Sequence, residues 1–171
     1  MKTLRFILGD QLNHKHSWYD QDDKDLIYFM AEMRQETDYV KHHIQKVVAF
    51  FEAMRNFSKW LEEHGKSVIY FKIDHPDNEQ DLVKNIKKLI KAHDIEKFEY
   101  QLPDEYRLDE QLKDFCKDLD LETEAYDTEH FLTSRTDLEK FYEGKKTYTM
   151  EYFYRDMRKK YKIMMVNDKD P

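Results

Sequence analysis

The strongest constraint on the fold is an alternation of short apolar runs with longer amphipathic segments. Runs with the length of a strand cover residues 4–8, 26–30, 68–72 and 97–102, and a fifth, weaker strand is expected at 122–126. Strands that alternate with helix-length segments form βαβ units and a parallel sheet with helices on both faces. The sequence therefore predicts an α/β fold with a Rossmann-like, open, parallel sheet of five strands.

A long helix is predicted over residues 37–64, because apolar side chains recur there at the spacing of one buried face. Gly65 follows, and glycine is the residue type that most often ends a helix. Further helices are expected over residues 79–93 and around 108–119, and polar residues 14–25 are expected to form a surface loop. The buried face of the long helix comprises Val40, Ile44, Val47, Val48, Phe51, Met54, Ser58 and Leu61.

The pattern changes after Asp127. A short helix is expected from Thr136, which has capping-box spacing to Glu139, and a last, aromatic-rich helix is expected over residues 149–161. We therefore expect three parts. They are an α/β domain at residues 4–130, a helical extension at 131–165, and a linker or truncated end at 166–171.

Composition narrows the class of protein. The chain has 171 residues, enough for one α/β domain, and its formal net charge of −7 argues against a free-standing nucleic-acid-binding protein. Its single cysteine, Cys116, allows no disulfide within the chain and is expected to be a buried, inert thiol. We expect no signal peptide, no membrane span and no membrane partner, and hence a cytoplasmic protein.

Polar side chains follow the first two predicted strands at the point where each ends. Gly9, Asp10 and Gln11 follow the first strand, and Glu32 and Met33 follow the second. Ligands of open α/β sheets bind at the carboxyl ends of strands, so these residues are candidates to bind a polyhydroxylated or heterocyclic ligand. Gly9 would let a ring approach the backbone. The alternative, in which Asp10 caps a turn and Glu32 is a solvated carboxylate, stays open.

Common phosphate, metal and nucleophile motifs are missing from the sequence. It contains no G-x-G-x-x-G fingerprint and no Walker-type loop, and its three glycines disfavour a phosphate cradle. His42 and His43 open the long helix without a partner at metal-ligand spacing, so no metal site is expected. His43 is expected on or near the buried face, where it would point into the ligand site or pack against a backbone carbonyl.

Four cationic residues are predicted to share one face of the last helix. Such a face, flanked by aromatic residues, is suited to contact phosphate, to stay solvated or to dock on another domain. The aromatic residues exceed what a terminal helix needs for packing on one side, so we expect this helix to contact something outside the chain. The candidates for domain contact or phosphate contact are Arg155, Arg158, Lys159 and Lys162.

Three stretches of the chain together resemble one protein family. They are LRFILGDQL at residues 4–12, YFMAEMRQETDYVKHHIQKVVAFFEAMRNF at 28–57, and YTMEYFYRDMRKKYKIMM at 148–165. The family is that of the deoxyribodipyrimidine photolyase-related proteins, the bacterial cryptochromes and (6-4) photolyases that carry an iron–sulfur cluster. The resemblance covers nearly the whole chain and implies an N-terminal α/β domain of such a protein.

The resemblance implies that this domain binds an antenna pigment, 6,7-dimethyl-8-ribityllumazine, at the strand ends. It also implies that FAD, a four-iron–four-sulfur cluster and the DNA-binding surface belong to a C-terminal domain absent from this chain. The single Cys116 cannot hold a cluster that needs four cysteines. Matching positions that would line the pigment pocket are Gly9, Asp10, Gln11, Glu32, Tyr39, His43 and Lys46.

These observations predict a function in light harvesting. The pigment would pass excitation to FAD in the absent domain, for light-driven DNA repair or signalling, and the parent protein would be a photolyase-type lyase. A pigment-free Rossmann-like interaction module that uses the aromatic and basic last helix is the alternative. A small enzyme on a doubly wound fold is disfavoured, because the sequence shows no motif for one.

Overall fold

The computed structural model describes residues 1–21, 24–38 and 40–165. The chain divides into two compact units, Met1–His130 and Phe131–Pro171. The first unit contains the sheet, and the second contains two helices among its described residues, up to 165. No helix of the described residues is long and apolar enough to cross a membrane.

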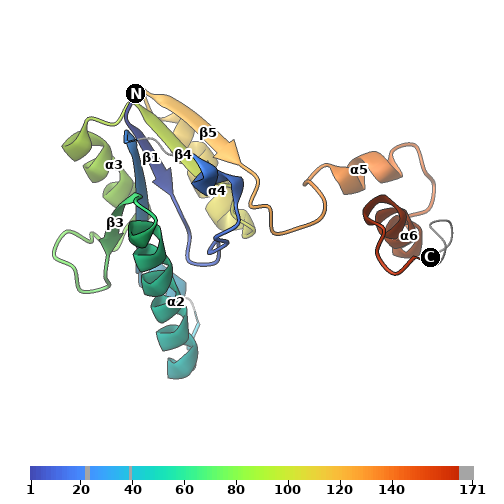
Figure 1. Ribbon diagram of the computed structural model, residues 1–171, viewed down its shortest axis with the longest axis horizontal. Coiled ribbons are helices and arrows are strands. Elements are labelled where there is room, and N and C mark those ends of the chain that lie inside the picture. The colour runs from blue at the N-terminus through green and yellow to red at the C-terminus, as the bar shows by residue number, and fades with distance from the viewer. Residues whose placement is uncertain (22–23, 39, 166–171) are drawn as a thin grey trace. The chain divides into compact units, whose positions relative to one another are not determined.

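The first unit is built on a parallel sheet of five strands, which confirms the predicted fold class (Figure 1). Its strands lie in the order β3-β2-β1-β4-β5. The central strand β1 pairs on one side with β2 and on the other with β4, so that Phe6 lies between Phe29 and Tyr100. The strands are β1 (Thr3–Phe6), β2 (Leu26–Ala31), β3 (Ser67–Phe71), β4 (Lys97–Gln101) and β5 (Glu122–Tyr126).

Helices cover both faces of the sheet, as the alternating pattern predicts. On one face, Tyr28 and Met30 pack against α2 (Ile44–Glu63) through Phe51, Met54 and Leu61. This face is called the α2 face below. On the opposite face, the core forms against α3 (Leu82–His93) and α4 (Tyr106–Lys117). The strand residues in that core include Leu4, Phe6, Phe29 and Phe98.

The predicted helix over residues 37–64 is wrong at its start. A short helix, α1 (Gln35–Asp38), ends before α2 begins at Ile44. His43 is the N-cap of α2, with extended backbone and a ring Nδ1 that accepts a hydrogen bond from the Gln45 N–H at 3.2 Å. The ring therefore satisfies one of the N–H groups that the first turn leaves free.

The first turns of α2 project beyond the carboxyl ends of the strands (Figure 1). As a result, two members of the predicted buried face, Ile44 at 67% and Val48 at 58%, are exposed, and Val40, which precedes the helix, is exposed at 50%. The face is buried from Phe51 onward. We call the exposed apolar part of this helix, Ile44 to Val48, the α2 overhang.

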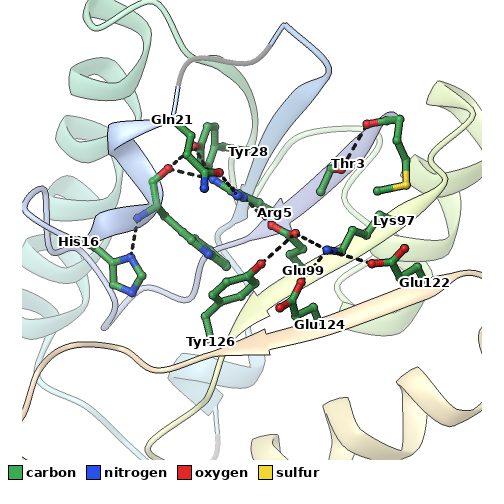
Figure 2. Close-up of polar contacts among 12 residues, drawn as sticks. Thr3, Arg5, His16, Gln21, Tyr28, Lys97, Glu99, Glu122, Glu124 and Tyr126 are labelled. Carbon is green, nitrogen blue, oxygen red and sulfur yellow. Dashed lines mark hydrogen bonds and ion pairs between the residues drawn. The ribbon is translucent and has the colours of Figure 1, made fainter.

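The predicted surface loop over residues 14–25 is partly wrong. It contains a 3₁₀ turn, η1 (Ser17–Asp20), whose Trp18 and Tyr19 are buried against the α2 face. Beneath Trp18, the Arg5 guanidinium pairs with Glu99 at 2.6 Å, and the two side chains are only 3% and 5% exposed. Figure 2 shows this pair continuing through Lys97 to the acidic side chains of β5. Sequence composition marks residues 14–25 as polar, but tertiary contacts bury its aromatic residues.

The second unit contains α5 (Asp137–Tyr142) and α6 (Met150–Tyr161). Its buried residues are Tyr142 and Phe153, which pack beside Phe141. Many large hydrophobic side chains of this unit remain exposed. Among them are Tyr148 at 72%, Tyr152 at 60%, Tyr154 at 59% and Met164 at 81%.

Candidate functional site

Strands β2 and β3 are added on one side of β1, and β4 and β5 on the other, so the order of strand addition switches between β1 and β4. In an open α/β sheet this is the point where ligands bind, beyond the carboxyl ends of the strands. The residues that follow these two strands, 9–11 and 102–104, therefore meet at one edge. We call this edge the carboxyl rim.

Gln11 ties the two halves of the carboxyl rim together. Its Oε1 accepts a hydrogen bond from the Leu8 N–H at 3.0 Å, and its Nε2 donates to the Gln101 carbonyl at 3.2 Å. The side chain is only 1% exposed. Gln11 therefore holds β1 and β4 in register at the rim, and its amide groups are already engaged.

Asp10 stands at the surface of the same rim, beside Asp104 and His130. His130 Nδ1 lies 3.5 Å from the Asp104 carboxylate. Asp10 is exposed as a residue, but the chain around its carboxyl partly desolvates it and so raises its pKa; Asp104 adds to the rise, whereas the Asp10 backbone N–H and His130 oppose it. Asp10 is thus an acceptor whose charged form would be stabilised by an added hydrogen-bond donor.

Gly9 allows α2 to lie close to the end of β1. A Cβ atom at Gly9 would lie 2.4 Å from Phe50 Cζ and 2.8 Å from Met54 Sδ. The space beside this glycine is therefore filled by the helix. The proposed ring contact at Gly9 stays a prediction, and the structure supplies a different reason for the glycine.

Glu32 is completely buried and its carboxylate is saturated with donors. Arg55 donates from Nε at 2.6 Å and from a terminal nitrogen at 3.0 Å, and the Tyr70 hydroxyl and the Ile73 N–H donate at 2.7 and 3.0 Å. Burial would raise the pKa of this carboxyl, but these hydrogen bonds outweigh it and lower the pKa. Glu32 therefore acts as a tie between β2, α2 and β3.

The remaining candidates do not gather at one point. Met33 is buried in the core on the side opposite α2, where Asn85 Nδ2 approaches its sulfur at 3.9 Å. His43 is exposed rather than buried, contrary to its predicted position, and Lys46 is exposed with its Nζ 3.2 Å from His42 Nδ1. Tyr39 lies outside the described residues.

A group of buried polar atoms at the end of β4 was not predicted. Gln101 is 1% exposed, and within residues 1–21, 24–38 and 40–165 neither its Oε1 nor its Nε2 has a hydrogen-bond partner. The same holds, over that described part, for the Tyr19 hydroxyl and Trp18 Nε1. In the sequence, Gln101 is marked only as a glutamine near the end of a predicted strand, and that signal is too weak to identify it as a site residue.

Two of the four cationic candidates at α6 donate hydrogen bonds to groups in or just after that helix. Arg155 donates to Glu151 at 2.6 Å, and Arg158 donates to the carbonyls of Ile163 and Met164 at the helix end. Lys159 and Lys162 are exposed. Among the described residues, no group of three or more His, Cys, Asp or Glu side chains could hold a metal ion.

Comparison with known proteins shows which family this chain resembles. The chain matches the family model described as deoxyribodipyrimidine photo-lyase-related protein over residues 5–171. It is also similar to a (6-4) photolyase of Agrobacterium fabrum, with 33% identity over 167 residues. The alignment covers 96% of this chain and 33% of that protein, so the chain spans about a third of the length of this curated relative.

Proposed function

This chain belongs to the deoxyribodipyrimidine photo-lyase-related protein family, and from that premise we propose that its first unit is an N-terminal antenna domain that binds a lumazine-type pigment at the carboxyl rim. A ribityl-lumazine absorbs near-ultraviolet and blue light and supplies excitation energy to an acceptor close by. The acceptor would be FAD in a C-terminal domain, which would also hold the iron–sulfur cluster and contact DNA for repair or signalling.

The observation that carries the proposal is the α2 overhang beside the polar carboxyl rim. Ile44 and Val48 expose apolar side chains at the start of α2, and their exposure supports a role in binding. A heterocycle needs an apolar wall together with a few polar groups that fix its orientation. The α2 overhang would supply the apolar wall, and Asp10 with the rim backbone would supply the polar groups.

The residues have distinct roles in this proposal. Asp10 would accept hydrogen bonds from ribityl hydroxyls, because it is exposed at the rim. Ile44 and Val48 would exclude water from one side of the ring. Gln11 and Glu32 would act indirectly, since their hydrogen bonds hold the strands and α2 in place. Tyr39, His43 and Lys46 stay candidates for the mouth of the pocket.

The test is a titration of the purified chain with 6,7-dimethyl-8-ribityllumazine, followed by pigment fluorescence and absorption. We expect saturable binding that weakens about tenfold in Asp10→Ala and in Ile44→Ser, since each loses one contact worth roughly 1.4 kcal/mol. Glu62→Gln, at the far end of α2, is the matched control. A folded chain without saturable binding, or equal affinity in all four proteins, would contradict the proposal.

A second candidate function is a pigment-free interaction module, and it is favoured by one specific observation. The second unit exposes Tyr148, Tyr152 and Tyr154, together with a groove that includes Leu132 and Met157. Apolar surface of this extent is typical of a protein-binding face. In a parent protein both functions are compatible, with the second unit contacting the FAD domain.

A further inference from the structure

The side chain of Gln101 has a hydrogen-bonding capacity that the described structure does not use. Its amide is 1% exposed, and both Oε1 and Nε2 lack a partner among the described residues. A buried polar group left unpaired costs about 1–3 kcal/mol, so native proteins rarely leave both ends of one amide unsatisfied. A partner that is neither backbone nor side chain of the described residues is therefore expected.

The position of Gln101 connects it to the carboxyl rim. It is the last residue of β4, and its carbonyl accepts the hydrogen bond from Gln11. Its side chain lies on the same face as that of Glu99, two residues earlier, which is the α2 face. The amide is thus on the side of the rim where α2 projects.

Two neighbouring groups from η1 share the lack of partners. The Tyr19 hydroxyl lies close enough to Gln101 for the amide to oppose the burial that raises the pKa of the phenol, yet no hydrogen bond of ordinary geometry joins them. Trp18 Nε1 is a buried donor, and its ring contacts Tyr126, the β5 neighbour of Gln101. The unused groups therefore comprise donors and acceptors together.

We infer that the Gln101 amide recognises the imide edge of a heterocycle bound at the carboxyl rim. An amide offers one donor and one acceptor side by side, which matches a ring N–H next to a ring carbonyl. A pyrimidinedione ring carries that edge at N3 and its flanking carbonyls. A fully ionised phosphate ester offers no complementary donor, and a purely apolar ring would leave both amide atoms unpaired. The inference rests on the proposed function and adds a specificity-determining residue to it.

The test uses Gln101→Met, which removes both hydrogen-bonding groups at similar volume. The whole chain is titrated with 6,7-dimethyl-8-ribityllumazine and with its 3-methyl analogue, which lacks the N3–H. We expect Gln101→Met to bind the pigment about tenfold more weakly than the unmodified chain. The unmodified chain should also reject the 3-methyl analogue by a similar factor, and Gln101→Met should bind both compounds alike.

Gln111→Met on α4 is the matched control, and it should bind like the unmodified chain. Thermal unfolding verifies that both variants fold, and Gln101→Met should be as stable as the unmodified chain or more so, because it removes unpaired buried atoms. If the unmodified chain binds the pigment but Gln101→Met binds it equally well, the inference is wrong and the proposed function stands. If the unmodified chain is folded and binds neither compound, the proposed function itself is wrong.

Discussion

At the scale of single residues, the buried Glu32 carboxylate has contacts that depend on its charge. It accepts hydrogen bonds from Arg55, Tyr70 and the Ile73 backbone while it is wholly shielded from water. Because its pKa is lowered in the folded state, the carboxylate stabilises the fold above its ordinary pKa of 4.5. That contribution is lost as the pH falls toward the lowered folded-state pKa.

We therefore expect Glu32→Gln to reduce the free energy of unfolding at pH 7 by about 2 kcal/mol, the usual worth of hydrogen bonds to a charged group. Between about pH 5 and pH 3 the variant should lose stability less steeply than the unmodified chain. Urea unfolding followed by circular dichroism at several pH values measures both quantities. Equal slopes over that pH range would show that Glu32 does not carry the acid sensitivity.

At the scale of elements, the contact between β1 and α2 depends on Gly9. Gly9→Ala would place a methyl group against Phe50 and Met54, and overpacking of this kind costs about 1–3 kcal/mol. In a Phe50→Ala background the same change should cost less than about 0.5 kcal/mol, because the flexible Met54 can move aside. Denaturant unfolding of the four proteins gives this double-mutant cycle. If the losses in unfolding free energy of the two single variants add up in the double variant, the cost of Gly9→Ala does not come from its contact with Phe50.

The sequence pattern predicted several helices and strands close to their observed bounds. The fifth strand was expected at residues 122–126 and is found at Glu122–Tyr126. The prediction was wrong at the start of α2, because the apolar spacing extends back to Val40. That spacing does not show that His43 adopts an extended backbone and caps the helix. The sequence analysis also missed Gln101 and Tyr19. Whether a buried polar side chain has a hydrogen-bond partner depends on tertiary contacts, which a local sequence pattern does not contain.

The sequence predicted where Asp10 and Gln11 lie, and their part in a binding site stays a prediction. Asp10 and Gln11 do lie at the strand ends, as the break after the first apolar run indicates. Whether a polar side chain there faces solvent or its own backbone depends on partners about 90 residues away in sequence, such as the Gln101 carbonyl bound by Gln11. These long-range contacts engage the side chains of Gln11 and Glu32 in holding the fold, whereas Asp10 is exposed.

At the scale of the whole molecule, charge is divided unevenly along the chain. Residues 131–165 contain nine Lys and Arg against five Asp and Glu, a formal charge of +4, although the complete chain carries −7. The exposed Tyr148, Tyr152 and Tyr154 lie in this basic part. A partner for the second unit should therefore combine apolar surface with acidic side chains.

We expect the exposed tyrosines to make the isolated chain self-associate at high concentration. Replacing Tyr148, Tyr152 and Tyr154 by serine should raise the dissociation constant of that association about tenfold, because aromatic surface drives it. Sedimentation velocity over a range of concentrations measures the effect. Tyr106→Ser is the matched control, since Tyr106 is 75% exposed on α4. A strictly monomeric unmodified chain would contradict the expectation.

The strand order also affects how the chain can fold during its synthesis on the ribosome. Thr3–Phe6 is made before the other four strands but forms the centre of the sheet, and one of its two neighbours is Lys97–Gln101. At about 5–20 residues per second, one edge of this hydrophobic strand waits several seconds for its partner. During that interval the nascent chain presents an unpaired apolar edge, which makes its amino-terminal residues a natural point of contact for chaperones.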